Sequence, residues 1–154
     1  MLSLQKGDKA PVFSAKDEQG NVIDLKDYQG KKLILFFYPK ASTPGCTAEA
    51  CNLRDFNKKL QEKGFSLLGV SADSPKRQQN FKSKNNLPFP LIPDVDKEII
   101  NAYGVWGPKK FMGKEYEGIH RTTFVIDEEG KIETIISKVK TKGHAEQILE
   151  LYSN

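Results

Sequence analysis

The chain has 154 residues, the length of a single domain, and its 24 Lys and Arg against 20 Asp and Glu give a net charge of +4. The basic residues form scattered pairs and no stripe, which argues against a nucleic-acid-binding face. The two cysteines are too few for a disulfide scaffold, and the strongest apolar run, residues 33–38, is far shorter than the roughly 20 residues of a membrane-spanning helix.

The first third of the chain is predicted to contain a hairpin, a strand and a long helix. Residues 12–16 and 21–25 flank a Gln-Gly-Asn turn and predict a short N-terminal β-hairpin. The apolar run over residues 32–38 predicts a central strand covered on both faces, and Pro39 ends it because proline cannot donate to a β-ladder. An apolar stripe at helical spacing then predicts a helix over residues 43–63.

The rest of the chain continues the alternation of strands and helices. In order it predicts a strand over residues 65–71, a helix over 74–84, an extended segment over 89–92, a short helix over 96–103, strands over 122–126 and 131–138, and a last helix over 144–152. Two strand–helix–strand units imply parallel pairing, and the closing hairpin implies an antiparallel edge. The predicted fold class is α/β, with a mixed central sheet, helices on both faces and an N-terminal hairpin, a three-layer layout that resembles a thioredoxin-like domain.

The compartment bears on how the cysteines are interpreted. Lys6 and Asp8 precede any long apolar stretch, so no signal peptide is visible, and we expect one cytoplasmic domain over residues 1–154. In a reducing compartment, cysteines are more often catalytic, redox-active or metal-binding than structural. A zinc site is disfavoured, because a C-x4-C pair on a helix followed by histidines 24 residues apart matches no usual zinc spacing.

Cys46 is placed where a helix favours a thiolate. Thr43 is a plausible N-cap and Pro44 suits the first helical position, so Cys46 falls at the third position of the predicted helix. The unpaired N–H groups of the first turn and the positive end of the helix dipole both stabilise negative charge there. The alternative is a buried, inert cysteine, which is a frequent fate of this residue type.

Cys51 follows on the same predicted helix, five residues after Cys46. That spacing puts the two Cα atoms roughly 8–9 Å apart, whereas disulfides rarely tolerate more than about 7 Å. The two sulfurs therefore never bond, or they bond only when the first turns of the helix unwind. The C-x4-C spacing also differs from the C-x-x-C pair of a dithiol reductase.

These residues carry a resemblance to a known family. The motif Pro39-x-x-x-Thr43-x-x-Cys46 resembles the active-site motif of the peroxiredoxins. The run FYPKASTPGCTAEAC over residues 37–51 resembles the bacterioferritin comigratory protein, or peroxiredoxin Q, subfamily. Further similar runs extend over nearly the whole chain: LRD at 53–55, YGVWG at 103–107, GIHR at 118–121, FVID at 124–127 and GK at 130–131.

The resemblance implies a thiol peroxidase and gives each site residue a role. The Cys46 thiolate would attack a peroxide oxygen and become a sulfenic acid, with its own backbone N–H stabilising the departing oxygen. The Thr43 hydroxyl would position the thiolate and the peroxide, and Pro39 would shield them from water or serve only as a strand terminator. Arg121 would reach Cys46 across the sheet, and Glu49 would orient Arg121.

The resemblance further implies that Cys51 resolves the sulfenic acid and that thioredoxin reduces the resulting Cys46–Cys51 disulfide. It implies a monomer with no cofactor and no metal, and neither His120 nor His144 is required as a base, so both are interpreted as structural or exposed. Two other functions stay open. One is a thiol–disulfide oxidoreductase on the same fold, and the other is a non-catalytic redox sensor that reacts stoichiometrically with peroxide.

Overall fold

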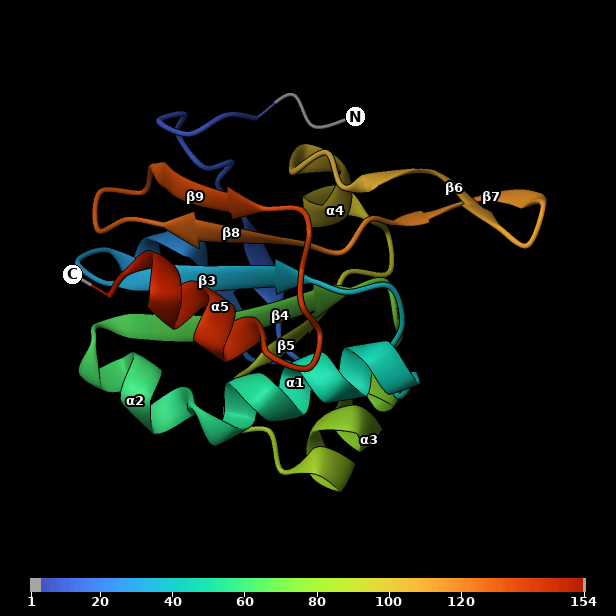
Figure 1. Ribbon diagram of the computed structural model, residues 1–154, viewed down its shortest axis with the longest axis horizontal. Helices are drawn as coiled ribbons and strands as arrows, with labels where there is room; N and C mark the ends of the chain where they lie inside the picture. The colour runs from blue at the N-terminus through green and yellow to red at the C-terminus, as the bar shows by residue number, and fades with distance from the viewer. Residues whose placement is uncertain (1–3, 154) are drawn as a thin grey trace.

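A five-stranded mixed sheet forms the middle layer of the computed structural model, which describes residues 4–153 (Figure 1). The strands are β3 (Lys32–Phe37), β4 (Phe65–Ser71), β5 (Leu91–Pro93), β8 (Thr122–Ile126) and β9 (Ile132–Ile136). Their order across the sheet is β5-β4-β3-β8-β9. The strands β3, β4 and β5 are parallel, whereas β8 pairs antiparallel with β3 and β9 antiparallel with β8. The predicted mixed sheet with an antiparallel edge is confirmed.

The central strand β3 is buried on both faces because its side chains alternate between two apolar cores. Ile34 and Phe36 belong to the core on one face of the sheet. Leu35 and Phe37 belong to the core on the other face. The continuous apolar run in the sequence therefore reflects a strand with a helical layer on each side.

Helices cover the two faces unequally. The helices α1 (Pro44–Asp55), α2 (Asn57–Glu62), α3 (Pro75–Asn85) and α5 (His144–Leu151) gather on the Ile34 face. The opposite face is covered by α4 (Glu98–Ala102), the 3₁₀ helix η1 (Leu25–Tyr28) and the antiparallel hairpin of β1 (Ser14–Lys16) and β2 (Val22–Asp24). The three-layer arrangement and the N-terminal hairpin are as predicted. Within residues 4–153, no helix is long and apolar enough to span a bilayer.

The long helix predicted over residues 43–63 is wrong in one respect, because the chain breaks it at Phe56. The backbone of Phe56 leaves the helical conformation at φ −103° and ψ 7°, and α2 begins at the next residue. The break lets the Phe56 side chain pack against the same core as Leu53 and Leu60. Both cysteines consequently lie on a separate helix, α1, that has 12 residues.

A second hairpin, which was not predicted from the sequence, is formed by β6 (Trp106–Phe111) and β7 (Lys114–Ile119). Its tight turn consists of Met112 and Gly113, both at positive φ, as two-residue hairpin turns require. A Met-Gly pair is a weaker turn signal than Asn-Gly, and the flanking strands lack a strict alternation of apolar and polar residues. The hairpin projects from the body of the molecule and leaves Phe111, Met112 and Tyr116 exposed (Figure 1).

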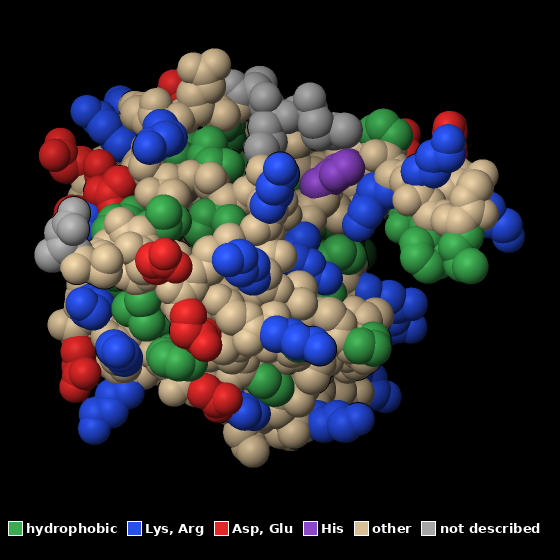
Figure 2. Space-filling model, in the orientation of Figure 1, with side chains coloured by type: hydrophobic (Ala, Val, Ile, Leu, Met, Phe, Trp, Pro, Cys, Tyr) green, Lys and Arg blue, Asp and Glu red, His purple; other side chains and the backbone are tan. Residues whose placement is uncertain are grey.

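Basic side chains are spread over the face of the molecule that Figure 2 shows. Lys and Arg side chains are spread over this face from one side to the other, and Asp and Glu side chains lie among them, most of them on the left of the view. On this face they form no continuous basic stripe of the kind that a nucleic-acid backbone would follow.

Candidate active site

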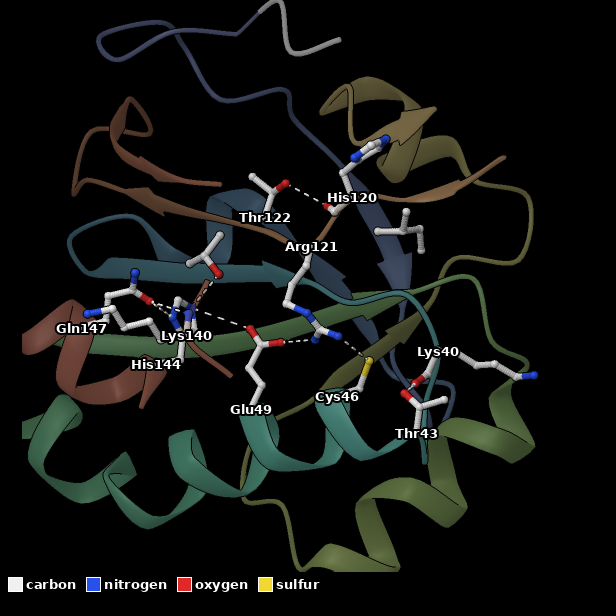
Figure 3. A network of polar contacts seen from close by, with 12 residues as sticks. Lys40, Thr43, Cys46, Glu49, His120, Arg121, Thr122, Lys140, His144 and Gln147 are labelled. Atoms are coloured by element: carbon white, nitrogen blue, oxygen red, sulfur yellow. Dashed lines mark hydrogen bonds and ion pairs between the residues drawn. The ribbon is translucent and has the colours of Figure 1, made fainter. Parts of the chain in front are cut away.

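Cys46 lies in the first turn of α1, beside the carboxyl end of β3 (Figure 3). Thr43 occupies the N-cap position with extended backbone angles, and Pro44 is the first helical residue. Cys46 is third, as predicted, and its side chain is 2% exposed. The N–H groups of this first turn have no partner within the helix, so they are available to an anion beside Cys46.

A buried polar network holds the loop between β3 and α1. The Ala41 N–H donates to Asp73 Oδ2 at 2.7 Å, and Ser71 Oγ donates to the same oxygen at 2.7 Å. Gln78 Nε2 donates to Ser71 Oγ at 2.8 Å, and the Tyr38 hydroxyl donates to Gln78 Oε1 at 2.5 Å. The loop that delivers Cys46 is therefore fixed to the ends of β3 and β4 and to α3. The sequence carried no signal for this network, because its members only meet through the parallel pairing of the strands.

Arg121 bridges Cys46 and Glu49 (Figure 3). Its Nη2 donates to Cys46 Sγ at 3.4 Å, and its Nη1 donates to Glu49 Oε1 at 2.6 Å. The register of β8 against β3 explains these contacts. Thr122 pairs with Phe37 at the end of β3, so the preceding residue, Arg121, lies beside the start of α1. The predicted contacts of Arg121 with Cys46 and of Glu49 with Arg121 are both present.

Gly45 gives the guanidinium the space that it occupies. A Cβ atom at this position would lie 3.2 Å from Arg121 Nη2, closer than most real Cβ contacts. Gly45 was not among the site residues predicted from the sequence. A glycine in the first turn of a helix could have signalled such a close approach, but which side chain approaches depends on β8.

Burial dominates the electrostatics of this cluster. It raises the pKa of the fully buried Glu49 to about 7, although the nearby Arg121 charge acts in the opposite direction. Burial lowers the pKa of the Arg121 guanidinium. The neighbouring Cys46 and Glu49 raise it by more, so the pKa lies above its ordinary value. Burial and the charge of Arg121 lower the pKa of Lys109, against an opposing influence of Cys46. Arg121 is thus the cation in contact with the sulfur, whereas Lys109 Nζ donates to the Ile119 carbonyl at 2.9 Å.

The Thr43 hydroxyl makes a different contact from the one predicted with Cys46. It donates to the Lys40 carbonyl at 2.7 Å and makes no side-chain cap of α1. Among the hydrogen bonds of residues 4–153, none joins Thr43 Oγ1 to Cys46. Pro39 follows β3 and is half-buried. The parts of Thr43 and Pro39 in catalysis stay predictions.

Cys51 lies in a different environment on the same helix. It is half-buried, and its thiol donates to Asn85 Oδ1 of α3 over 3.6 Å. Both cysteines are free thiols, and α1 is continuous through both positions. The helix would have to unwind before the two sulfurs met, so the resolving role of Cys51 stays a prediction.

His144 extends the cluster, and sequence reasoning did not foresee its contact with the site. The imidazole is fully buried at the start of α5, with Nε2 3.7 Å from Glu49 Oε2. The two residues are far apart in sequence, and no motif joins them. His120 instead places Nε2 3.0 Å from the Pro108 carbonyl. Within residues 4–153, no three His, Cys, Asp or Glu side chains gather in a way that could hold a metal ion.

An open cavity of about 460 Å³ reaches the guanidinium from outside. Arg121, Lys109 and Lys138 contribute the charged part of its wall, and Val105 and Val139 contribute apolar surface. Cys46 does not line this cavity. A ligand in it would therefore contact the guanidinium of Arg121 before it reached the sulfur.

Comparison with known proteins places these features in a family. Residues 6–135 match the model of the AhpC/TSA family. The chain is 46% identical to peroxiredoxin Bcp of Escherichia coli (strain K12) over 149 residues. This alignment covers 97% of this chain and 96% of the relative. Among solved structures it resembles peroxiredoxin Q of Xanthomonas campestris, with 35% identity, a TM-score of 0.85 and coverage of 92% of this chain and 89% of that one. It also resembles peroxidoxin BcpB of Mycobacterium tuberculosis, with 34% identity, a TM-score of 0.83 and coverage of 96% and 95%.

Proposed function

The chain belongs to the AhpC/TSA family and is a peroxiredoxin, and from this premise we propose that Cys46 is the residue that reduces peroxides. The observation that carries the proposal is the Arg121 guanidinium 3.4 Å from Cys46 Sγ, at the N-terminus of a helix. This is a cationic, largely water-excluded position in which a thiolate is stabilised. Hydrogen peroxide and organic hydroperoxides are the proposed substrates.

In the first step the Cys46 thiolate sulfur attacks the terminal oxygen of the peroxide. A bond forms between the sulfur and the terminal hydroxyl oxygen, the oxygen–oxygen bond breaks, and the departing oxygen takes a proton from solvent and leaves as water or an alcohol. The sulfur loses two electrons and becomes a sulfenic acid, while the peroxide is reduced. Arg121 and the first-turn N–H groups of α1 stabilise the charge that develops on the oxygens.

In the second step Cys51 resolves the sulfenic acid. Its sulfur attacks Cys46 Sγ, a disulfide forms, and the hydroxide leaves with the proton of the Cys51 thiol as water. Thioredoxin then reduces the disulfide through a mixed disulfide. Because both sulfurs belong to one chain, the cycle needs no second subunit, and we propose a monomer that works in a reducing compartment.

Disulfide formation requires α1 to unwind, because a helix keeps Cα atoms five residues apart beyond disulfide reach. Amide hydrogen exchange over residues 44–54 measures this. We expect faster exchange in the oxidised protein than in the reduced protein, whereas exchange in β4 stays unchanged. Equal protection of residues 44–54 in both forms would sink the unwinding step.

One assay tests the proposed function against its two alternatives. Peroxide consumption is followed with thioredoxin, thioredoxin reductase and NADPH, for the wild type and for Cys46→Ser. We expect sustained turnover by the wild type and none by the variant. A thiol–disulfide oxidoreductase would exchange disulfides without consuming peroxide, and a redox sensor would consume one equivalent and stop. Sustained turnover by Cys46→Ser would falsify the assignment of Cys46.

A further inference from the structure

Ser42 has a backbone conformation that its residue type rarely adopts. It lies in the loop between β3 and α1, shortly before Cys46, and its φ is 66°. In this left-handed region the Cβ of an L-residue crowds the following carbonyl oxygen, so turns that need a positive φ generally use glycine or asparagine. The Ser42 side chain is exposed, and its hydroxyl takes part in none of the hydrogen bonds of residues 4–153. The forces that hold Ser42 in this conformation therefore come from its neighbours.

The turn at Ser42 is held by a hydrogen bond on each side. The Ala41 N–H donates to Asp73 Oδ2 at 2.7 Å, and this bond anchors the residue before Ser42 to the segment that follows β4. On the other side, the Thr43 hydroxyl donates to the Lys40 carbonyl at 2.7 Å and closes the turn (Figure 3). Of these two bonds, only the one to Asp73 ties the turn to a distant part of the chain.

Asp73 is itself placed by a buried network. Ser71 Oγ donates to the same Oδ2 at 2.7 Å and accepts from Gln78 Nε2 at 2.8 Å. Ser71 and Gln78 are fully buried, and Asp73 is 9% exposed. Arg77 Nη1 lies 4.0 Å from Asp73 Oδ1, but the Arg77 side chain is 61% exposed, so this ion pair contributes little. Hydrogen bonds from the core, rather than a surface charge, therefore fix the carboxyl group.

The turn at Ser42 sets where α1 begins. Thr43 is the N-cap of α1, so a change of φ at Ser42 would re-aim the next peptide groups and move the first helical turn. That helical turn carries Cys46, whose Sγ lies 3.4 Å from Arg121 Nη2. A displacement of about 1 Å between groups that must be held in line for a reaction can cost roughly 10²-fold in rate. The anchor of the turn is therefore expected to affect the reactivity of Cys46.

We propose that Asp73 is a positioning residue of the peroxide-reducing site. Its bond with the Ala41 N–H holds Ser42 in the left-handed conformation, and that conformation places Cys46 against Arg121. The proposal rests on the function proposed above for Cys46. It gives Asp73 no contact with the peroxide and no proton to transfer. Its effect passes through the turn at Ser42, and a single substitution can make that turn easier to form.

The first test is a double-mutant cycle on the second-order rate constant of Cys46 with hydrogen peroxide. We expect Asp73→Ala to slow the reaction by about tenfold, because Ser42 leaves the left-handed region once its anchor is lost. Glycine adopts a positive φ without the cost that serine pays. In a Ser42→Gly background the same substitution should therefore lower the rate by less than about threefold. An equal loss in both backgrounds would overturn the proposal.

Two conservative variants separate the position of the Asp73 oxygen from its charge, and they carry the test if Asp73→Ala does not fold. Asn keeps an acceptor oxygen at the same distance from the backbone, whereas Glu keeps the charge but moves the carboxyl group by one methylene. We expect Asp73→Asn to stay within about threefold of the wild-type rate and Asp73→Glu to lose about tenfold. Arg77→Gln removes only the weak ion pair, so this control should keep the wild-type rate. Equal rates for the Asn and Glu variants would contradict the proposal.

A spectroscopic test does not depend on peroxidase activity. The one-bond ¹³Cα–¹Hα coupling of Ser42, measured by NMR on the reduced protein, reports whether its φ is positive. We expect the wild type and Asp73→Asn to show the left-handed conformation, and Asp73→Ala and Asp73→Glu to lose it. A left-handed Ser42 in the Ala and Glu variants overturns the proposal. Absence of peroxide turnover in the wild type would instead refute the function proposed for Cys46, and the Ser42 coupling would still decide whether Asp73 holds the turn.

Discussion

The two cysteines of α1 share one helix but have opposite surroundings. Cys46 is almost fully buried, with a guanidinium 3.4 Å from its sulfur. Cys51 is half-buried, and its thiol faces the neutral amide oxygen of Asn85 at 3.6 Å. A cation favours a thiolate, whereas an acceptor oxygen favours a protonated thiol. This difference in neighbours supports the proposal that Cys46 reacts first and Cys51 second.

The two ends of α1 are also held by different elements. Arg121, which precedes β8, contacts the first turn through Cys46 and Glu49. Further along, Asn52 accepts from the Ala145 N–H of α5 at 2.6 Å, and Arg54 donates to the Asn85 carbonyl of α3 at 2.8 Å. The helix that the proposed cycle unwinds is thus fixed at both ends. In that proposal the contacts of the first turn serve the reaction of Cys46, and the contacts further along the helix resist its unwinding.

The largest expected effect comes from removing the second sulfur. Cys51→Ser should react with one equivalent of peroxide at close to the wild-type rate and then stop as a sulfenic acid, because no partner thiol resolves it. Mass spectrometry after dimedone trapping detects the stalled species, and the NADPH assay measures the loss of turnover. Normal turnover of this variant with thioredoxin would mean that Cys51 is not needed for resolution.

The next largest effect is expected from removing the cation beside Cys46. Arg121→Gln should slow the first step by roughly 10²–10³, the usual cost of a lost donor to a developing charge. Arg121→Lys keeps the charge but not the two-point contact with Cys46 and Glu49, and it should recover only part of the rate. Stopped-flow measurement of sulfenic acid formation tests both variants. A Gln variant as fast as the wild type would remove Arg121 from the mechanism.

A smaller effect should come from loosening the Cys51 end of the helix. Asn85→Ala removes the acceptor of the Cys51 thiol and leaves the first step untouched. We expect disulfide formation to accelerate by about two- to fivefold, which corresponds to one modest hydrogen bond. Rapid-quench sampling of sulfenic acid and disulfide measures the step. A slower resolution would instead mean that Asn85 aims the thiol at Cys46.

The smallest effect concerns stability against pH. Glu49, with a pKa of about 7 against an ordinary 4.5, binds more protons when folded, so its contribution to the free energy of unfolding falls as pH rises between those values. His144, with a pKa of about 4 against 6.5, binds more protons when unfolded, so its contribution rises with pH between about 4 and 6.5. The two contributions offset each other in the wild type between about pH 4.5 and 6.5.

Single substitutions should separate these opposed contributions. The free energy of unfolding of Glu49→Gln should rise more steeply with pH than that of the wild type, because only the His144 contribution remains. In His144→Phe it should fall with increasing pH between about 4.5 and 7, the range in which the unfolded chain ionises Glu49 before the folded protein does. Urea denaturation at a series of pH values measures the slopes. Parallel curves for all three proteins would show that the two groups are not linked to folding in this way.

Much of the site could be predicted where the signal is local. The Thr43-Pro44 start of α1 fixed the place of Cys46, and the spacing to Cys51 showed that the sulfurs cannot bond in an intact helix. The resemblance over residues 37–51 and 118–121 selected Arg121 and Glu49, whose contacts are present. Predictions failed where the sequence carries only a weak sign of a turn or of a helix end, as at the Met112-Gly113 turn and at the Phe56 break.

What the sequence by itself determined is the part set by near neighbours in the chain: the central strand buried on both faces, the start of α1, and the motif that marks the family. Only the tertiary structure decided that the Thr43 hydroxyl turns to Lys40, that Asp73 holds the loop before α1, and that His144 faces Glu49. The contacts of Asp73 with the loop and of His144 with Glu49 join segments 32 and 95 residues apart, and they depend on strand register and helix packing, which no local pattern encodes. Burial then sets the charge of Glu49 and His144, and burial exists only once the layers have closed over them.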